Sequence, residues 1–367
     1  MRILLATPDY PPMRGGIQLL LERLVRHSRF SYEVVTLSAP TGSRRASTSP
    51  GVMRSPRLAG HRSAVAGLNV WTLGRAIARR PDAVLSGHIV TGPAALAVQA
   101  LLGAPVIQYL YGDEFRDRPG LSRFVTQRAK ASVAVSSHTR RLALALGASA
   151  DRVHVILPGV DPPAAPAPQP APREGGAPPT IVTVARLEDR YKGFDVTLRA
   201  LPLVRARVPD ARWVVVGDGS LRGELQAMTR SQGVADCVTF AGALDDAARD
   251  AWLDRADVFV MPSQLMPGGL GGEGFGIVYL EAGAHGLPCV AGNVGGSVDA
   301  VIDGETGLLV DPTDHVALAD AIADLLLDPA LRSRLGRAGR ARAERLSWAR
   351  MAEEVDALIE RVVAGER

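Results

Sequence analysis

The apolar residues of this 367-residue chain are grouped in short runs separated by longer amphipathic stretches. The first run, residues 2–6, leads through a glycine-containing loop into residues 17–27, whose apolar positions repeat at helical spacing. Short apolar runs recur at 33–37, 83–85, 105–109, 132–135 and 153–156. Short strands alternating with helices are typical of a parallel sheet covered on both faces, so we predict a doubly wound α/β domain here.

A change of composition divides the chain. Residues 162–179, PPAAPAPQPAPREGGAPP, cannot form a packed core and are predicted to be a linker. The alternation then resumes, with apolar runs at 180–185, 213–217, 238–240, 258–261, 288–291 and 307–310. We therefore predict an N-terminal Rossmann-like domain (1–161), the linker (162–179), a second Rossmann-like domain (180–346) and a final amphipathic helix within 347–367. Because ligands bind at the carboxyl ends of such strands, we expect the two domains to face a cleft between them.

The net charge of +4 conceals an uneven distribution, +13 over residues 1–160 and −9 over the remainder. A basic half favours an anionic ligand or surface, although a genome that prefers arginine over lysine would also produce it. Aromatic residues make up only 5% of the chain and form no cluster with basic ones, so nucleic acid is not an expected partner.

Several features predict a cytoplasmic protein. The only two cysteines, Cys237 and Cys289, are too few for a disulfide framework and fit small buried thiols. The N-terminus does not resemble a signal peptide. The longest uncharged run, residues 89–111, is interrupted by Gly and Pro, so we predict a helix, a turn and a buried strand instead of a membrane span.

Two junctions have the residues needed to hold an anion. Gly15 and Gly16 follow the first strand and open the first helix, where free N–H groups attract negative charge. The fingerprint G-x-G-x-x-G is absent there, which argues against a nicotinamide cofactor. After the strand at 180–185, Arg186 and Lys192 could neutralise a diphosphate, and Lys192 is one of only two lysines in the chain.

A third constellation is the stretch EGFGIVYLE, residues 273–281. Phe275, Gly276, Ile277 and Val278 are predicted to open a helix with N–H groups facing phosphate or sugar, while Glu273 and Glu281 accept hydrogen bonds from hydroxyl groups. Carboxylates beside a phosphate site fit a ligand with a polyol, so a nucleotide sugar is indicated. Gly217, and the glycines of 292–299, follow other strands and are weaker candidates.

These motifs resemble those of the family 4 retaining glycosyltransferases, which have the GT-B fold. The resemblance rests on residues 261–312, on ATPDYPPMRGGIQ (6–18) and on ARLEDRYKG (185–193), and it covers nearly the whole chain. Within the family, the chain resembles the actinobacterial phosphatidylinositol-mannoside mannosyltransferases. The pair Glu273 and Glu281 matches the family's E-x7-E motif.

The resemblance implies a role for each matched residue. Arg186 and Lys192 would hold the donor diphosphate, Glu281 the ribose, and Glu273 the transferred sugar. The backbone amides of 275–278 would surround sugar and phosphate, and Gly16 would lie against the diphosphate. The final helix would cross back to the N-terminal domain.

One position departs from the family pattern. Relatives usually have a His before Gly112, where this chain has Tyr111, so the identity of the donor sugar is left open. His88 lies at another predicted strand end and could line the acceptor side. Asp9, Asp113 and Glu114 are expected near the cleft, where they would suit a cationic aminocyclitol.

The predicted activity is transfer of a hexose from GDP-mannose, a UDP-hexose or UDP-GlcNAc to a hydroxyl of a small-molecule or lipid-headgroup acceptor, with retention of configuration. No D-x-D occurs in the chain, so no metal or other cofactor is expected. The alternatives are a natural-product glycosyltransferase, a sugar-nucleotide epimerase of the same fold, and a binding module without activity. The basic N-terminal half would allow peripheral association with the inner face of the membrane, and the oligomeric state stays open.

Overall fold

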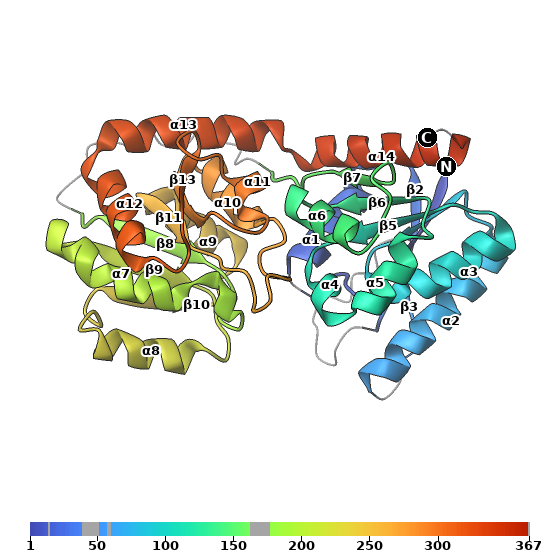
Figure 1. Cartoon of the computed structure of the whole chain (residues 1–367), viewed down its shortest axis with the longest axis horizontal. Coiled ribbons are helices and arrows are strands. Elements are labelled where there is room, and N and C mark those ends of the chain that lie inside the picture. The colour runs from blue at the N-terminus through green and yellow to red at the C-terminus, as the bar shows by residue number, and fades with distance from the viewer. Residues whose placement is uncertain (14, 39–50, 57–59, 162–176, 366–367) are drawn as a thin grey trace. The chain divides into compact units, whose positions relative to one another are not determined.

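The computed structural model describes residues 1–13, 15–38, 51–56, 60–161 and 177–365. Most of the predicted linker, residues 162–176, lies outside these ranges. The chain forms two compact units, one of Met1–Gly159 with the C-terminal segment from Trp348, the other of Val160–Ser347. Figure 1 shows a sheet in each, with helices packed around it.

The first unit contains a seven-stranded sheet in the order β3-β2-β1-β4-β5-β6-β7. All of its strand pairs are parallel. Its strands are β1 (Arg2–Ala6), β2 (Ser31–Thr36), β3 (Val52–Arg54), β4 (Ala83–Ser86), β5 (Val106–Leu110), β6 (Ala131–Ala134) and β7 (Val153–Val155). Its helices are α1 (Gly16–His27), α2 (His61–Arg79), η1 (Ile89–Thr91), α3 (Gly92–Leu102), α4 (Asp113–Asp117), α5 (Pro119–Thr126), α6 (Ser137–Ala145) and α14 (Trp348–Ala364).

The second unit contains a six-stranded parallel sheet in the order β10-β9-β8-β11-β12-β13. Its strands are β8 (Thr180–Val184), β9 (Arg212–Val216), β10 (Val238–Gly242), β11 (Val258–Met261), β12 (Cys289–Gly292) and β13 (Gly307–Val310). Its helices are η3 (Arg190–Lys192), α7 (Phe194–Arg207), α8 (Arg222–Ser231), α9 (Asp246–Arg255), α10 (Ile277–Ala284), α11 (Ser297–Ala300), α12 (His315–Leu327) and α13 (Pro329–Arg345).

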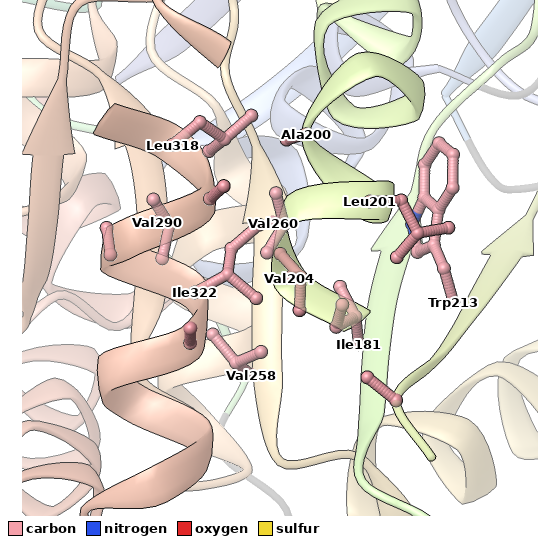
Figure 2. Packing of buried hydrophobic residues seen from close by; sticks show 14 of the residues in the cluster. Ile181, Ala200, Leu201, Val204, Trp213, Val258, Val260, Val290, Leu318 and Ile322 are labelled. Atoms are coloured by element: carbon pink, nitrogen blue, oxygen red, sulfur yellow. The ribbon is translucent and has the colours of Figure 1, made fainter. Parts of the chain in front are cut away.

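Alternating side chains of the central strands fill the core of the second unit. Val258 and Val260 of β11 point to the face of the sheet that α7 and α12 cover. There they belong to the same buried cluster as Ile322 of α12 (Figure 2). Phe259, between them, faces the other side of the sheet. Its ring packs edge-on against the ring of Tyr279 in α10, with the ring centroids 5.7 Å apart. A strand buried on both faces reads as a continuous apolar run, which explains why VFVM was recognisable in the sequence.

The predicted strands are confirmed, most within one or two residues of their bounds, and the fold class is as expected. The prediction missed β3, a short strand at the sheet edge whose three residues are half-buried. The uncharged run 89–111 forms η1, α3 and β5, as predicted. None of the helices in the described ranges is long and apolar enough to cross a bilayer. Both cysteines are buried free thiols.

The final helix belongs to the first unit. α14 packs against α1, although more than 300 residues separate them in the chain. The buried carboxylate of Asp356 accepts hydrogen bonds from the Ser28 hydroxyl (2.6 Å) and the Arg29 N–H (2.9 Å). These bonds satisfy the buried carboxylate and fix α14 at a defined register on the residues that follow α1.

Candidate active site

The strand order of the second sheet reverses between β8 and β11. Strands β9 and β10 lie beyond β8, and β12 and β13 lie beyond β11. In doubly wound sheets, ligands bind outside the carboxyl ends of the strands at such a switch point. The segment after β8 carries Arg186 and Lys192, and the segment after β11 carries Glu273.

Lys192 and Glu273 meet at this switch point although 81 positions separate them. The Lys192 ammonium forms an ion pair with a Glu273 carboxylate oxygen. Only 13% of the lysine side chain and 11% of the glutamate side chain are exposed, so water screens the pair little. The sequence predicted both residues for the same ligand, and the structure brings them together.

Two glycines allow the close approach on which this arrangement depends. Gly193 has φ +76°, and a Cβ there would lie 2.3 Å from the Pro262 carbonyl oxygen. The segment bearing Lys192 therefore touches the segment that leads to Glu273 only because position 193 lacks a side chain. At Gly217, which has φ +142°, a Cβ would lie 1.9 Å from the Ala185 carbonyl oxygen. Chain packing therefore requires glycine at position 217.

Helix α10 begins inside the E-x7-E motif. It starts at Ile277, two residues later than the start predicted at Phe275, because Gly276 is its left-handed N-cap (φ 90°). The Tyr279 hydroxyl donates a hydrogen bond to the Met261 carbonyl oxygen at 2.6 Å, which ties the helix to the end of β11. The first N–H groups of a helix have no acceptor within it, so this end offers donors and partial positive charge.

Glu281 lies one turn into α10, where it is largely buried. The nearest cation is Arg249 of α9, whose Nη1 lies 3.7 Å from a Glu281 oxygen. Burial raises the pKa of Glu281, and Arg249 partly opposes that rise. Arg249 therefore helps to keep Glu281 ionised, as an acceptor for hydroxyl donors.

Arg186 is far more accessible than Lys192. Its side chain is 64% exposed and pairs with Asp189 at 3.1 Å, within the same loop. A guanidinium held only by an exposed pair can turn toward an incoming anion at little cost.

The glycines after β12 have a structural use. The Gly296 N–H donates to the Glu273 carbonyl oxygen at 2.8 Å, and a Cβ at Gly296 would lie 2.0 Å from the Gly274 carbonyl oxygen. The glycines of 292–299 were predicted as weaker candidates for holding a ligand. The Gly296 amide holds the loop that presents Glu273.

In the first sheet, the order reverses between β1 and β4. Asp9 follows β1 and His88 follows β4, and His88 Nε2 lies 4.0 Å from Asp9 Oδ2. The other ring nitrogen of His88 accepts a hydrogen bond from the Val90 N–H. Gln18 of α1 donates to Asp9 Oδ1 at 3.0 Å, and Gly15 and Gly16 begin that helix. Asp9 and His88, which were weak candidates in the sequence, thus lie close together at the β1/β4 switch point.

Tyr111 extends this group from the end of β5. Its hydroxyl donates to the Gly87 carbonyl oxygen at 3.0 Å, and its ring stacks on Tyr109 with centroids 5.8 Å apart. Burial raises the pKa of Tyr111 well above its ordinary value, so the phenol remains a donor and cannot serve as a base.

Glu114 is buried and holds the turn at the end of β5. Its two oxygens accept the N–H groups of Tyr111 and Gly112, both at 2.8 Å, and burial raises its pKa to about 7. The Asp113 carboxylate lies 3.8 Å from Arg116 of the same helix. Glu114 was predicted as an acidic residue near the acceptor, but its carboxylate is occupied by the backbone.

The residues that sequence reasoning missed are those that support others. Arg249, Gln18 and Tyr279 each position a candidate residue. Gln18 and Tyr279 lie inside the quoted motifs but were not singled out there, and Arg249 lies outside every motif. Arg249 lies in DDAARD, which looks like an ordinary solvated helix face. Within the described ranges, no three His, Cys, Asp or Glu side chains converge to hold a metal ion.

Solved structures identify the class of this fold. The structure of Anabaena HepE in complex with UDP superposes with a TM-score of 0.80 at 19% identity, covering 98% of this chain and 100% of that chain. Two parallel-sheet α/β units of this kind, together with that likeness, define the GT-B fold.

The sequence then identifies the family. Residues 14–163 match "Glycosyltransferase Family 4", and residues 169–342 match "Glycosyl transferases group 1". A GDP-mannose-dependent alpha-(1-6)-phosphatidylinositol monomannoside mannosyltransferase of Mycolicibacterium smegmatis is 36% identical, with 92% of each chain covered. A D-inositol 3-phosphate glycosyltransferase of Paenarthrobacter aurescens is 34% identical, over 74% of this chain and 71% of that one. The chain belongs to the family 4 glycosyltransferases, and it is an enzyme of that class.

Proposed function

We propose that this enzyme transfers a mannosyl group from GDP-mannose to a hydroxyl of an inositol-phosphate-containing acceptor, with retention of configuration and without a metal ion. The observation that carries the proposal is the Lys192–Glu273 pair at the β8/β11 switch point, beside the start of α10. The choice of donor and acceptor rests on what the similar mannosyltransferase and inositol-phosphate glycosyltransferase are named for.

The second unit would bind the donor. Lys192 and Arg186 would take the diphosphate, together with the first N–H groups of α10, and Glu281 would accept hydrogen bonds from the ribose diol. When the diphosphate pairs with Lys192, Glu273 shares its cation and can accept a hydrogen bond from a sugar hydroxyl. The resting ion pair would thus keep both groups placed until the donor arrives.

The bond changes need no protein nucleophile. The acceptor oxygen forms a bond to the anomeric carbon on the face from which the diphosphate departs. The bond between that carbon and the phosphate oxygen breaks, and the acceptor proton passes to the departing oxygen. Lys192 and Arg186 would stabilise the negative charge that develops there, which is the usual way such sites accelerate transfer.

The first unit would bind the acceptor. Its sequence is strongly basic, which favours a phosphorylated headgroup. Helix α2 also exposes three large apolar side chains, Val70 (74%), Trp71 (37%) and Ile77 (52%). Apolar side chains beside arginines suit a surface of anionic lipid, so we propose peripheral membrane association through this unit.

The first experiment is a thermal-shift panel of GDP, GDP-mannose, UDP, UDP-glucose and UDP-GlcNAc. A ligand that binds only the native state raises the melting temperature, so the guanosine compounds should give the larger shifts. Larger shifts with the uridine compounds would overturn the choice of donor.

A transfer assay then tests the acceptor. With labelled GDP-mannose, the product should form on phosphatidylinositol monomannoside or inositol phosphate, also after treatment with EDTA, and Glu281→Ala should abolish it. Product only on an aminocyclitol would favour the natural-product alternative, for which the carboxylate of Asp9 is the candidate contact. Turnover without any acceptor would indicate an epimerase, and binding without turnover would overturn the proposal.

A further inference from the structure

A second basic site lies in the first unit, at the edge of the sheet opposite to Asp9, His88 and Tyr111. It is a hollow of about 400 Å³, lined by residues at the starts of β6 and β7 and by residues of α14. The strands are parallel, so their amino ends lie at the edge away from the switch point. None of the residues that carry the proposed transfer reaction lines this hollow.

Three cations come to the hollow from three separate segments. Lys130 precedes β6, Arg152 precedes β7, and Arg361 lies in the last turn of α14. None of the three side chains forms a hydrogen bond or ion pair with another described residue. Most other arginines of this unit that the structure describes around α1 and α2 have such partners, for example Arg29 with Glu360 and Arg75 with Glu33.

Among the described lining residues, one carboxylate faces these three cations. It is Asp151, which accepts a hydrogen bond from the Ser149 hydroxyl. Arg140 of α6 is engaged with the carbonyl oxygens of Val153 and Ala150. Like charges gathered around one hollow repel one another, and a bound anion would remove that repulsion.

The shape and the walls narrow the class of ligand. A volume of about 400 Å³ exceeds what a bare phosphate fills and lies within the range of small-molecule sites. Leu358 and Val362 of α14 give one wall an apolar character. Lysine and arginine together suit phosphate oxygens, and the remaining volume suits a polyol-sized group.

We propose that this hollow binds the phosphate of a phosphorylated polyol, at a site separate from the one that performs transfer. The phosphate could be that of a free metabolite or of a lipid headgroup. Because one cation lies just before β6, one just before β7 and one in α14, the bound phosphate would join the C-terminal helix to the sheet. The proposal does not depend on the proposed donor or acceptor.

His154 of β7 supplies a local reporter. It borders the hollow, and its pKa is lowered by burial and by the charges of Arg361 and Arg140, with Asp151 opposing. Lys130 and Arg152 are the other charges lining the same hollow. A phosphate bound among these cations must raise the His154 pKa, because it favours the protonated imidazole.

The test is an NMR titration of protein carrying ¹³C-labelled histidine, with the His154 signal assigned by its disappearance in His154→Gln. At matched ionic strength, sn-glycerol 3-phosphate should raise the His154 pKa. Lys130→Gln combined with Arg152→Gln should weaken binding about a hundredfold, roughly tenfold for each charge-assisted hydrogen bond removed. Arg123→Gln, which removes an exposed arginine of α5 outside the hollow, should change nothing, and Lys192→Ala should leave the His154 response intact.

A vesicle-binding measurement distinguishes a lipid headgroup from a free metabolite as the source of the phosphate. If vesicles of phosphatidylcholine with phosphatidylglycerol bind the wild type and the double variant no longer binds them, the ligand is a lipid headgroup. If only glycerol 3-phosphate responds, it is a free metabolite. An unmoved His154 signal, or an equal response in the double variant, would overturn the site. Melting in phosphate-free buffer verifies that each variant is folded.

Discussion

The two switch points of this molecule have the same topology and present different side chains. In the second unit, the strands flanking the reversal present a buried ion pair, Lys192 with Glu273, next to a helix start. In the first unit, the corresponding strands present Asp9, His88 and Tyr111. The fold provides the place for a ligand twice, and the side chains decide which ligand each place suits.

Under the proposed function, this difference would match the two halves of a transfer reaction. A leaving diphosphate needs cations where charge develops, while an acceptor hydroxyl needs hydrogen-bond acceptors and donors that orient it. The net charges of the two halves of the sequence do not follow this division. The half with a net negative charge is the one that contains Arg186 and Lys192. Net charge therefore says little about a site of a few residues, and local geometry says more.

Removing the cation at the second switch point should have the largest effect. Lys192→Ala should reduce kcat/KM by about 10²–10³-fold, as is typical when one group that stabilises developing charge is removed. Arg190→Ala is the matched control, because Arg190 lies two residues away but is bound to Glu224 at 2.6 Å. Equal reductions in both variants, measured by steady-state kinetics on folded protein, would remove Lys192 from the mechanism.

Arg249 tests whether the carboxylate of Glu281 must be kept charged. Arg249→Met should raise the KM for the donor by about tenfold and leave kcat nearly unchanged, since it weakens one charge-assisted interaction in the ground state. Without Arg249 the pKa of Glu281 rises further, so the increase in KM should grow as the pH is lowered. Arg249→Lys should restore part of the affinity, and Arg255→Met on the same helix should have no effect. A KM that is independent of pH in Arg249→Met would contradict this role.

Tyr111 tests the first switch point. Tyr111→Phe removes the bond to the Gly87 carbonyl oxygen, so the free energy of unfolding should fall by about 1 kcal/mol. Tyr111→His restores the residue usual in the family and should change the ratio of kcat/KM between GDP-mannose and GDP-glucose. An unchanged ratio would place Tyr111 outside the sugar site, as a residue that only joins two strand ends.

Glu114 should give the smallest effect, visible only as a function of pH. Its pKa is about 7 in the folded protein and ordinarily 4.5, so the folded state binds the proton more tightly. The free energy of unfolding should therefore fall as the pH rises from about 4.5 to 7. In Glu114→Gln this contribution disappears, while the exposed Asp117→Asn should keep the wild-type dependence. Urea unfolding at a series of pH values measures the free energy of unfolding. If that free energy depends on pH in the same way in the wild type and in Glu114→Gln, the assignment is refuted.

The sequence alone determined the succession of elements. Strands buried on both faces, such as VFVM of β11, must be continuously apolar, so their positions are visible without a partner. The motif residues Arg186, Lys192, Glu273 and Glu281 were identified for a related reason, because glycine-rich strand ends beside charged residues are uncommon outside ligand sites. The short edge strand β3 escaped because its residues are half-buried and carry no such pattern.

Only the tertiary structure decided the partners. That Lys192 meets Glu273, that Arg249 supports Glu281, and that Glu114 is bound by the backbone all depend on interactions between segments that local sequence patterns do not connect. The same holds for the three cations that converge where β6, β7 and α14 meet. A local pattern reports the burial of each residue along its own strand or helix, whereas the choice of neighbour is made by the packing of the whole unit.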